Sequence, residues 1–132
     1  MNAPIAPPAR HWTKESIAAL AAFFDLPNRP DMQDWPFEVA DCSRLPEFLE
    51  ALERFDDPDI RFTLLDIVIQ SFEEGEIGLS TDKEWRWIEN YLNGNFELHA
   101  YQIWYWSSFD ASIADAWRVS TRMRTIWTAH SP

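Results

Sequence analysis

Glycine, cysteine and long apolar runs are all scarce in this sequence. Three glycines and one cysteine occur among 132 residues. The lone Cys42 cannot form an intrachain disulfide, and it suits a reducing compartment. The longest wholly apolar run, 17–24, has eight residues, whereas a transmembrane helix needs about 20. We therefore expect neither a disulfide framework nor a membrane-spanning segment.

The first ten residues also lack the features of a secretory signal peptide. They contain no positively charged leading region and no continuous apolar stretch, and three of the ten are proline. We predict a disordered, Pro-rich tail over 1–11. The protein is then expected to be cytoplasmic, and most simply bacterial.

Motifs that bind phosphate or carry catalysis are missing as well. The glycines are isolated, so there is no Gly-rich phosphate loop, and no Gly-x-Ser-x-Gly motif occurs. His11, His99 and His130 lie too far apart for the ligand spacing of a zinc site. The acidic clusters 56–59 and 73–76 lack the register of an EF-hand loop. We therefore expect no enzyme activity, no cofactor and no bound metal.

Negative charge is abundant, and it is concentrated in the middle of the chain. The formal net charge is −11, and residues 31–89 hold seventeen Asp or Glu against five Lys or Arg, a net charge of −12. Such a segment repels nucleic acid and anionic membranes, because both bind through Lys and Arg set against phosphates. A basic protein partner is favoured. The alternative is that the acidity only keeps a Trp-rich surface in solution.

Repeated capping signals and the scarcity of glycine predict an all-α protein. We expect a single compact domain over 12–130 with five or six short helices. The expected helices begin at Thr13, span 45–55, run from an N-cap at Asp57 to Gly75, run from an N-cap at Thr81 to Gly94, extend from a cap at Asn95 to about Ser107, and span about 120–129. Strands remain the alternative for 61–72 and for 98–106, which are rich in strand formers. The Pro-punctuated segment 25–42 shows no usable periodicity.

One carboxylate occurs in an otherwise apolar stretch. Asp66 lies among the apolar residues of 64–69, in the helix expected to be central. If it is buried, it needs a partner such as Arg61, Arg86 or an arginine of the last helix. If it is exposed, it lies on the one polar stripe of that helix.

The acidic residues on the helix 45–55 form a stripe. Glu47, Glu50 and Glu53 follow one another at spacings of three residues, which places them on the outer face of the expected helix. Asp56, the acidic cluster 73–76 and one tryptophan complete the predicted partner-binding set. That set is Glu47, Glu50, Glu53, Asp56, Glu73, Glu74, Glu76 and Trp87.

Aromatic side chains number twenty, of which eight are Trp. Most should be buried or half-buried. In the pairs Trp85/Trp87 and Trp104/Trp106 the two members point to opposite sides of a helix, so one member of each faces outward. The aromatic side chains that the core does not hold could instead line a ligand pocket, and aromatic walls favour a planar or cationic ligand. The expected lining is Trp87, Tyr91, His99, Tyr101 and Trp104.

A further pattern covers about 60–127. It consists of Arg61-Phe62-Thr63-Leu64-Leu65, Ile69-Gln70-Ser71-Phe72-Glu73-Glu74, then Trp85, Ile88 and Leu92, then Tyr105-Trp106 and finally Arg124. The pattern resembles small acidic bacterial proteins of the immunity type. The resemblance implies a cytoplasmic, helical protein that neutralises a partner toxin by tight binding, and it identifies no individual contact residue.

The leading hypothesis is therefore an immunity-type inhibitor that binds a basic toxin or effector through its acidic surface. The alternative is a small-ligand-binding module with an aromatic-lined pocket. A homodimer that hides surplus aromatic side chains is compatible with both.

Overall fold

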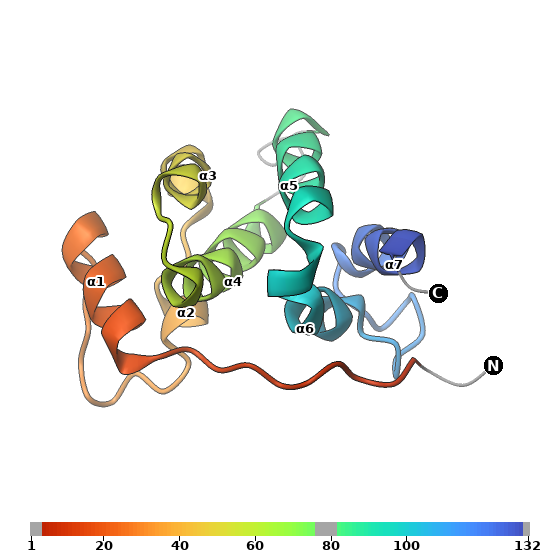
Figure 1. Ribbon diagram of the computed structural model, residues 1–132, viewed down its shortest axis with the longest axis horizontal. Coiled ribbons are helices and arrows are strands. Elements are labelled where there is room, and N and C mark those ends of the chain that lie inside the picture. The colour runs from red at the N-terminus through yellow and green to blue at the C-terminus, as the bar shows by residue number, and fades with distance from the viewer. Residues whose placement is uncertain (1–3, 76–81, 131–132) are drawn as a thin grey trace. The chain divides into compact units, whose positions relative to one another are not determined.

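A computed structural model describes residues 4–75 and 82–130, and all regular secondary structure within these ranges is helical (Figure 1). The chain divides into two compact units. Residues 11–84 form the acidic unit, which contains eighteen Asp or Glu and six Lys or Arg, a net charge of −12. Residues 1–10 and 85–132 form the aromatic unit, which has a net charge of +1 and six of the eight Trp. Charge and tryptophan are thus separated in the fold as well as in the sequence.

The helices occupy most of the described chain. In the acidic unit they are α1 (Lys14–Phe24), α2 (Trp35–Glu38), the 3-10 turn η1 (Cys42–Arg44), α3 (Leu45–Arg54) and α4 (Pro58–Glu74). They are followed by α5 (Asp82–Gly94), α6 (Phe96–Ser107) and α7 (Ser120–His130). None of the described helices is both long enough and apolar enough to cross a membrane.

Local capping explains where α1 and α4 begin. The Thr13 hydroxyl accepts a hydrogen bond from the Ser16 amide at 3.0 Å, and the Thr13 amide donates to the Ser16 hydroxyl at 3.2 Å. At α4, one carboxylate oxygen of Asp57 accepts from the amides of Asp59 and Ile60 at 2.8 and 3.1 Å. Each cap satisfies backbone donors that have no partner within the helix. Both predicted starts are confirmed.

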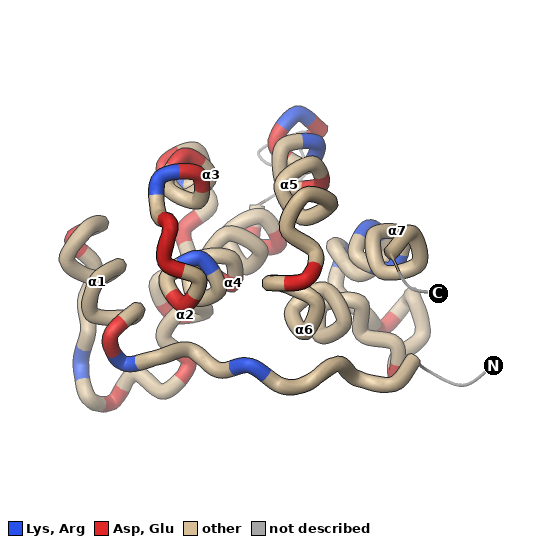
Figure 2. Tube along the Cα trace, in the orientation of Figure 1, with Lys and Arg blue, Asp and Glu red and all other residues tan. Residues whose placement is uncertain are grey.

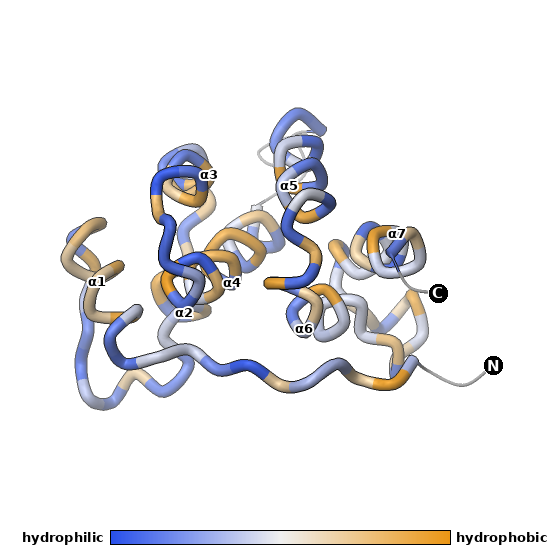
Figure 3. Tube along the Cα trace, viewed as in Figure 1, coloured by the Kyte–Doolittle hydropathy of each residue, from blue (hydrophilic) through white to orange (hydrophobic). Residues whose placement is uncertain are grey.

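α4 is the central helix of the acidic unit. Helices α1, α2 and α3 all pack on it, and hydropathy along its middle is strongly apolar (Figure 3). The residues buried on α4 are Phe62, Thr63, Leu64, Leu65, Asp66, Ile67, Val68, Ile69, Ser71 and Phe72. Because a helix that is apolar nearly all round must be covered on several sides, the central position of α4 follows from its composition. The strand alternative for 61–72 is wrong.

Asp66 is buried, with 5% of its surface exposed. One of its oxygens accepts a hydrogen bond from the Trp12 indole at 2.8 Å, a partner that the sequence did not suggest. Next to this pair the hydroxyls of Ser16 and Thr63 lie 2.7 Å apart. These contacts tie the start of α1 to the middle of α4. The interpretation of Asp66 as an exposed residue is therefore wrong.

The aromatic unit is built around the packing of α6 on α7. Its core contains the buried side chains of Ile103, Trp106, Val119, Met123 and Ile126. Residues 98–106 lie within α6, so their strand alternative is also wrong. At its N-terminal side, the carbonyl of Pro4 accepts a hydrogen bond from the Trp104 indole at 3.3 Å. Residues 4–13 form no helix or strand, and disorder over 1–11 stays a prediction.

The described residues contain seven α-helices, not five or six. The additional helix is α2, which lies in the Pro-punctuated segment 25–42. Its Pro36 occupies the first turn, where a missing amide hydrogen is tolerated. Trp35 is 1% exposed and its indole donates to the carbonyl of Pro27 at 2.7 Å. A four-residue helix is too short to show periodicity, so tertiary burial of Trp35 rather than local pattern explains it.

Other boundaries agree with the expected ones to within about two residues. α3 ends at Arg54, with Phe55 as its cap, and α7 reaches His130. Helix α5 begins at Asp82 and includes Gly94. Thr81, its expected N-cap, lies outside the described residues.

Candidate functional site

The acidic stripe predicted on 45–55 lies on α3 and the loop that follows it. Glu47, Glu50, Glu53 and Asp56 are all exposed. Phe48 and Leu52 of α3 are buried, and α3 packs on α4. Figure 2 shows acidic residues along α3 and through the loop to α4. The burial of one side of α3 thus leaves its carboxylates in water.

Two arginines neutralise the first half of this stripe. Arg44 contacts Glu47 at 2.9 Å, and Arg54 contacts Glu50 at 2.8 Å, four residues apart on the same helix. Pairs of this kind on a surface contribute only about 0–1 kcal/mol to stability. A cation from a binding partner can therefore compete for Glu47 and Glu50 at small cost.

Arg44 has a second role, because it links α3 to the end of α1. Its Nη2 donates to the carbonyl of Phe24 at 3.0 Å, and its guanidinium lies 5.8 Å from the Phe24 ring centre and 5.6 Å from that of Phe48. The last carbonyls of a helix carry partial negative charge, which a nearby cation stabilises. Arg44 therefore has a structural duty that Arg54, with its single exposed ion pair, does not share.

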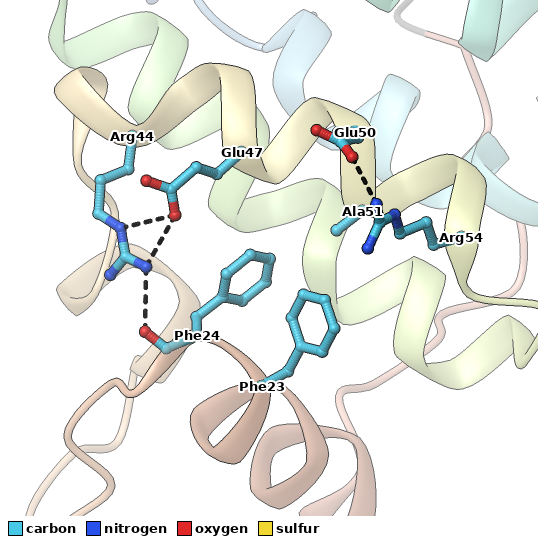
Figure 4. Close-up of a pocket in the computed structure, with 7 residues that line it drawn as sticks. All are labelled: Phe23, Phe24, Arg44, Glu47, Glu50, Ala51 and Arg54. Carbon is cyan, nitrogen blue, oxygen red and sulfur yellow. Dashed lines mark hydrogen bonds and ion pairs between the residues drawn. The ribbon is translucent and has the colours of Figure 1, made fainter.

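A pocket of about 200 Å³ lies between the end of α1 and α3. Figure 4 shows the Arg44–Glu47 and Arg54–Glu50 ion pairs with the rings of Phe23 and Phe24 below them. Its lining consists of Phe23, Phe24, Arg44, Glu47, Glu50, Ala51 and Arg54. Phe23 remains 51% exposed, although the centre of its ring lies 4.9 Å from that of Phe24 and 5.0 Å from that of Phe55. An exposed apolar ring therefore lies beside paired charges, an arrangement typical of a contact surface rather than a reaction centre.

The second half of the stripe is chemically different. Glu53 and Asp56 make no hydrogen bond or ion pair with any other residue in the described ranges. The adjacent Asp57 uses its carboxylate as the cap of α4. Within the stripe, the carboxylates without a paired arginine are thus Glu53, near the C-terminal end of α3, and Asp56, in the loop that follows it.

The remaining predicted partner residues lie elsewhere. Glu73 is half-buried, and Glu74 is exposed and accepts a hydrogen bond from the Gln70 amide at 3.1 Å. Both are at the C-terminal end of α4, whereas Glu76 lies outside the described residues. Trp87 belongs to the aromatic unit, where it is half-buried and stacks on Tyr91 with ring centres 5.7 Å apart.

The predicted ligand pocket corresponds in large part to a hydrogen-bonded core. His99 is fully buried: its Nε2 lies 2.8 Å from the Tyr91 hydroxyl and its Nδ1 lies 2.7 Å from Oε1 of Gln102. Because an amide oxygen only accepts, Nδ1 carries the hydrogen, and in the neutral ring Nε2 accepts from Tyr91. Tyr101 and Trp104 are half-buried with ring centres 5.8 Å apart. The lining of the pocket in Figure 4 contains none of the five predicted residues. A second pocket, in the aromatic unit, has one of them, Trp104, in its lining.

Two further side chains, Asp41 and Cys42, carry groups capable of proton or thiol chemistry. The carboxylate of Asp41 accepts hydrogen bonds from the hydroxyl and the amide of Ser43, which lower the pKa of Asp41. Cys42 is a half-buried free thiol. Among residues 4–75 and 82–130, no group of three or more His, Cys, Asp or Glu side chains is placed to hold a metal ion.

Comparison of the chain with protein-family models, with curated proteins and with solved structures found no match. The class of protein is thus defined by the fold alone: an all-helical chain with an acidic and an aromatic unit. The sequence did not indicate Phe23 and Arg44, two residues that line the pocket of the acidic unit. Arg54 could have been identified, because it follows Glu50 at the spacing of an intrahelical ion pair.

Proposed function

We propose that this chain is a binding protein whose acidic unit recognises a basic surface on a partner protein. The observation that carries the proposal is the row of exposed carboxylates on α3 beside the exposed ring of Phe23. The acidic unit carries a net charge of −12, which attracts a basic partner over distances of about a Debye length. The fitting partner is a protein rich in Lys and Arg, not a nucleic acid or an anionic membrane.

The finer form of the proposal is an immunity-type inhibitor that acts in the bacterial cytoplasm on a basic toxin. Opposite charges accelerate the encounter of two proteins, whereas desolvated aromatic contacts slow their separation. Glu53 and Asp56 provide the charge for the first step. Phe23, half-exposed at the edge of the pocket, provides apolar surface for the second.

The two halves of the acidic stripe should contribute unequally. Glu47 and Glu50 already form ion pairs with Arg44 and Arg54, so much of their charge is neutralised before a partner binds. Glu53 and Asp56 have no such cation among the described residues. Reversing their charge is therefore expected to affect association more than reversing Glu47 and Glu50.

Association kinetics of the whole protein test the proposal. The probe is the basic protein encoded beside this gene, or the basic protein that the tagged chain retains from its native cell at low salt. We expect Glu53→Lys with Asp56→Lys to lower the association rate constant about tenfold or more and to flatten its dependence on salt. The control, Asp31→Lys with Glu97→Lys, changes the net charge equally at exposed positions outside α3.

Two results would contradict the proposal. If both double variants slow association equally, only net charge matters and α3 is not the contact surface. If neither variant changes the rate, the acidic unit does not steer the partner at all. Replacing Phe23 by Ala should instead raise the dissociation rate constant and leave the association rate within about twofold.

A further inference from the structure

The aromatic unit contains a second pocket, of about 380 Å³, where α6 ends. Its lining consists of Trp104, Tyr105, Ser108, Phe109, Asp110 and Trp117. Four of these six side chains are aromatic and one is a carboxylate. The volume falls within the range of about 300–1,000 Å³ usual for small-molecule sites.

The backbone at the end of α6 gives this pocket its shape. Ser108 caps the helix in the left-handed conformation, with φ of 50°. That conformation ends the helix, and the next two residues, Phe109 and Asp110, line the pocket with Trp104 and Tyr105 from the last turns of α6. The pocket is thus made by a single helix end and the loop that follows it.

Arg124 of α7 holds this loop in place. Its guanidinium donates to the carbonyls of Ser107, Ser108 and Ala111 at 2.7, 2.6 and 3.0 Å, and lies 5.4 Å from the centre of the Phe109 ring. Three charge-assisted hydrogen bonds to one loop restrict its motion before any ligand arrives. A preorganised site loses less entropy on binding. These neutral carbonyls leave the guanidinium its positive charge, and because it already lies against Phe109, that ring is not among those expected to contact a cation.

The aromatic rings that line the pocket are fixed but incompletely covered. Trp117 is 37% exposed and Tyr105 is 39% exposed. The Trp117 ring lies 4.8 Å from that of buried Trp106 and 5.4 Å from that of Tyr105. Ring contacts of this kind hold an indole in one orientation while one surface stays open to solvent.

The chemistry of the lining favours a cation. The faces of aromatic rings are negative, and they attract a cation held within about 6 Å of the ring centre. Asp110 adds a full negative charge at the pocket, and it makes no hydrogen bond or ion pair with another described residue. The indole hydrogen of Trp104 is occupied by the carbonyl of Pro4, which leaves the ring rather than the donor for recognition.

We propose that this pocket binds a small organic cation with an alkylated ammonium group, with Trp117, Tyr105 and Trp104 contacting the alkyl groups and Asp110 balancing the charge. Alkylation spreads the positive charge over an apolar surface, so such a cation loses less hydration than a primary amine when aromatic rings surround it. The site is independent of the acidic stripe on α3, because every residue in it belongs to the aromatic unit.

Titration of the full chain with choline and with tetramethylammonium, at constant ionic strength, tests this site. The readout is the set of eight indole signals in a proton–nitrogen NMR spectrum, assigned by single Trp→Phe variants. We expect the signals of Trp104 and Trp117 to move together with saturation. The signals of Trp12 and Trp35 serve as internal controls, because both residues lie in the acidic unit.

The charge requirement is tested with a matched ligand and a matched variant. The neutral isostere of choline, 3,3-dimethylbutan-1-ol, should bind about tenfold more weakly than choline, because it keeps the shape and loses the charge. Asp110→Asn should weaken choline binding to a similar degree, whereas Asp115→Asn, at an exposed position outside the lining, should leave it within about twofold.

Three outcomes overturn the proposal. The first is the absence of saturable shifts with either cation. The second is equal binding of choline and its neutral isostere, which would make the pocket an apolar site. The third is an equal loss in Asp110→Asn and Asp115→Asn, which would indicate nonspecific attraction to the acidic chain. A thermal melt of each variant shows whether its fold is intact. Trp117→Phe provides a second test, because it reduces the aromatic surface of the pocket and leaves the charge of the pocket unchanged.

Discussion

The hydrogen bond between Trp12 and Asp66 is expected to hold the start of α1 to the core of the acidic unit. The indole nitrogen lies 2.8 Å from a carboxylate that is 5% exposed. A hydrogen bond to a charged group contributes about 1.5–3 kcal/mol. Trp12→Phe keeps an aromatic ring against Phe37, whose centre lies 5.3 Å away, and removes the donor. We therefore expect Trp12→Phe to lower the free energy of unfolding by about 1.5–3 kcal/mol.

A double-mutant cycle with Asp66→Asn shows whether this loss comes from the pair. Urea denaturation followed by circular dichroism gives the free energy of unfolding of the wild type, both single variants and the double variant. In the Asp66→Asn background the indole faces a neutral amide oxygen, and its removal should cost about 1 kcal/mol less. A loss below about 0.5 kcal/mol for Trp12→Phe, or strict additivity in the cycle, would refute the assignment of an energetic role to this bond.

Two further predictions concern single polar groups. Tyr91→Phe removes the hydroxyl that donates to buried His99 and should cost about 1–3 kcal/mol in urea denaturation, with Trp87→Phe as a control that keeps the hydrogen bond. Asp41 has a lowered pKa because Ser43 donates to its carboxylate twice. The ionised carboxylate of Asp41 therefore stabilises the fold above the ordinary carboxyl pKa, and this stabilisation is lost as the pH falls through the lower pKa of Asp41 in the folded protein. The stability difference between wild type and Asp41→Asn should shrink over that acidic interval in pH-dependent melts, and a constant difference would contradict it.

Helix positions could be predicted from the sequence where local chemistry decides them. Thr13 and Asp57 cap their helices through their own side chains, and such bonds depend on residues only two or three positions apart. Helix α2 could not be predicted, because its cause is the burial of Trp35 against the rest of the unit and its bond to Pro27. Tertiary contacts of this kind leave no periodic signal in four residues.

The candidate site divides in the same physical way. The stripe of Glu47, Glu50 and Glu53 is visible in the sequence, because regular spacing on a helix fixes which side chains share a face. Arg44 lies outside that helix, and its contact with Phe24 depends on how α1 packs beside α3. Phe23 is followed by another phenylalanine, and the sequence alone does not tell which ring is buried. The structure covers Phe24 and leaves Phe23 half-exposed.

The pocket at the end of α6 depends on one backbone conformation. The left-handed φ of Ser108 ends α6 immediately before Phe109 and Asp110, which line the pocket together with Trp117. Serine adopts this conformation less often than glycine or asparagine, so a serine at this position does not predict the turn. The sequence predicts Trp104 in a ligand pocket and one member of the Trp104/Trp106 pair on the outer face, but it gives no prediction for Trp117, which lies in the loop between α6 and α7.

Separation of charge and aromatic surface into two units gives the two proposed sites different sensitivities to salt. The proposed recognition on α3 would depend on the summed field of exposed carboxylates, and salt screens such a field over a Debye length of about 8 Å at physiological ionic strength. The proposed cation binding in the aromatic unit would depend on one carboxylate and on rings that act only in contact, within about 6 Å. Added salt should therefore weaken association with a basic protein much more than it weakens the binding of a small cation. Because the aromatic unit has a net charge of only +1, the proposed selectivity for a cation is expected to come from Asp110 and the ring faces themselves.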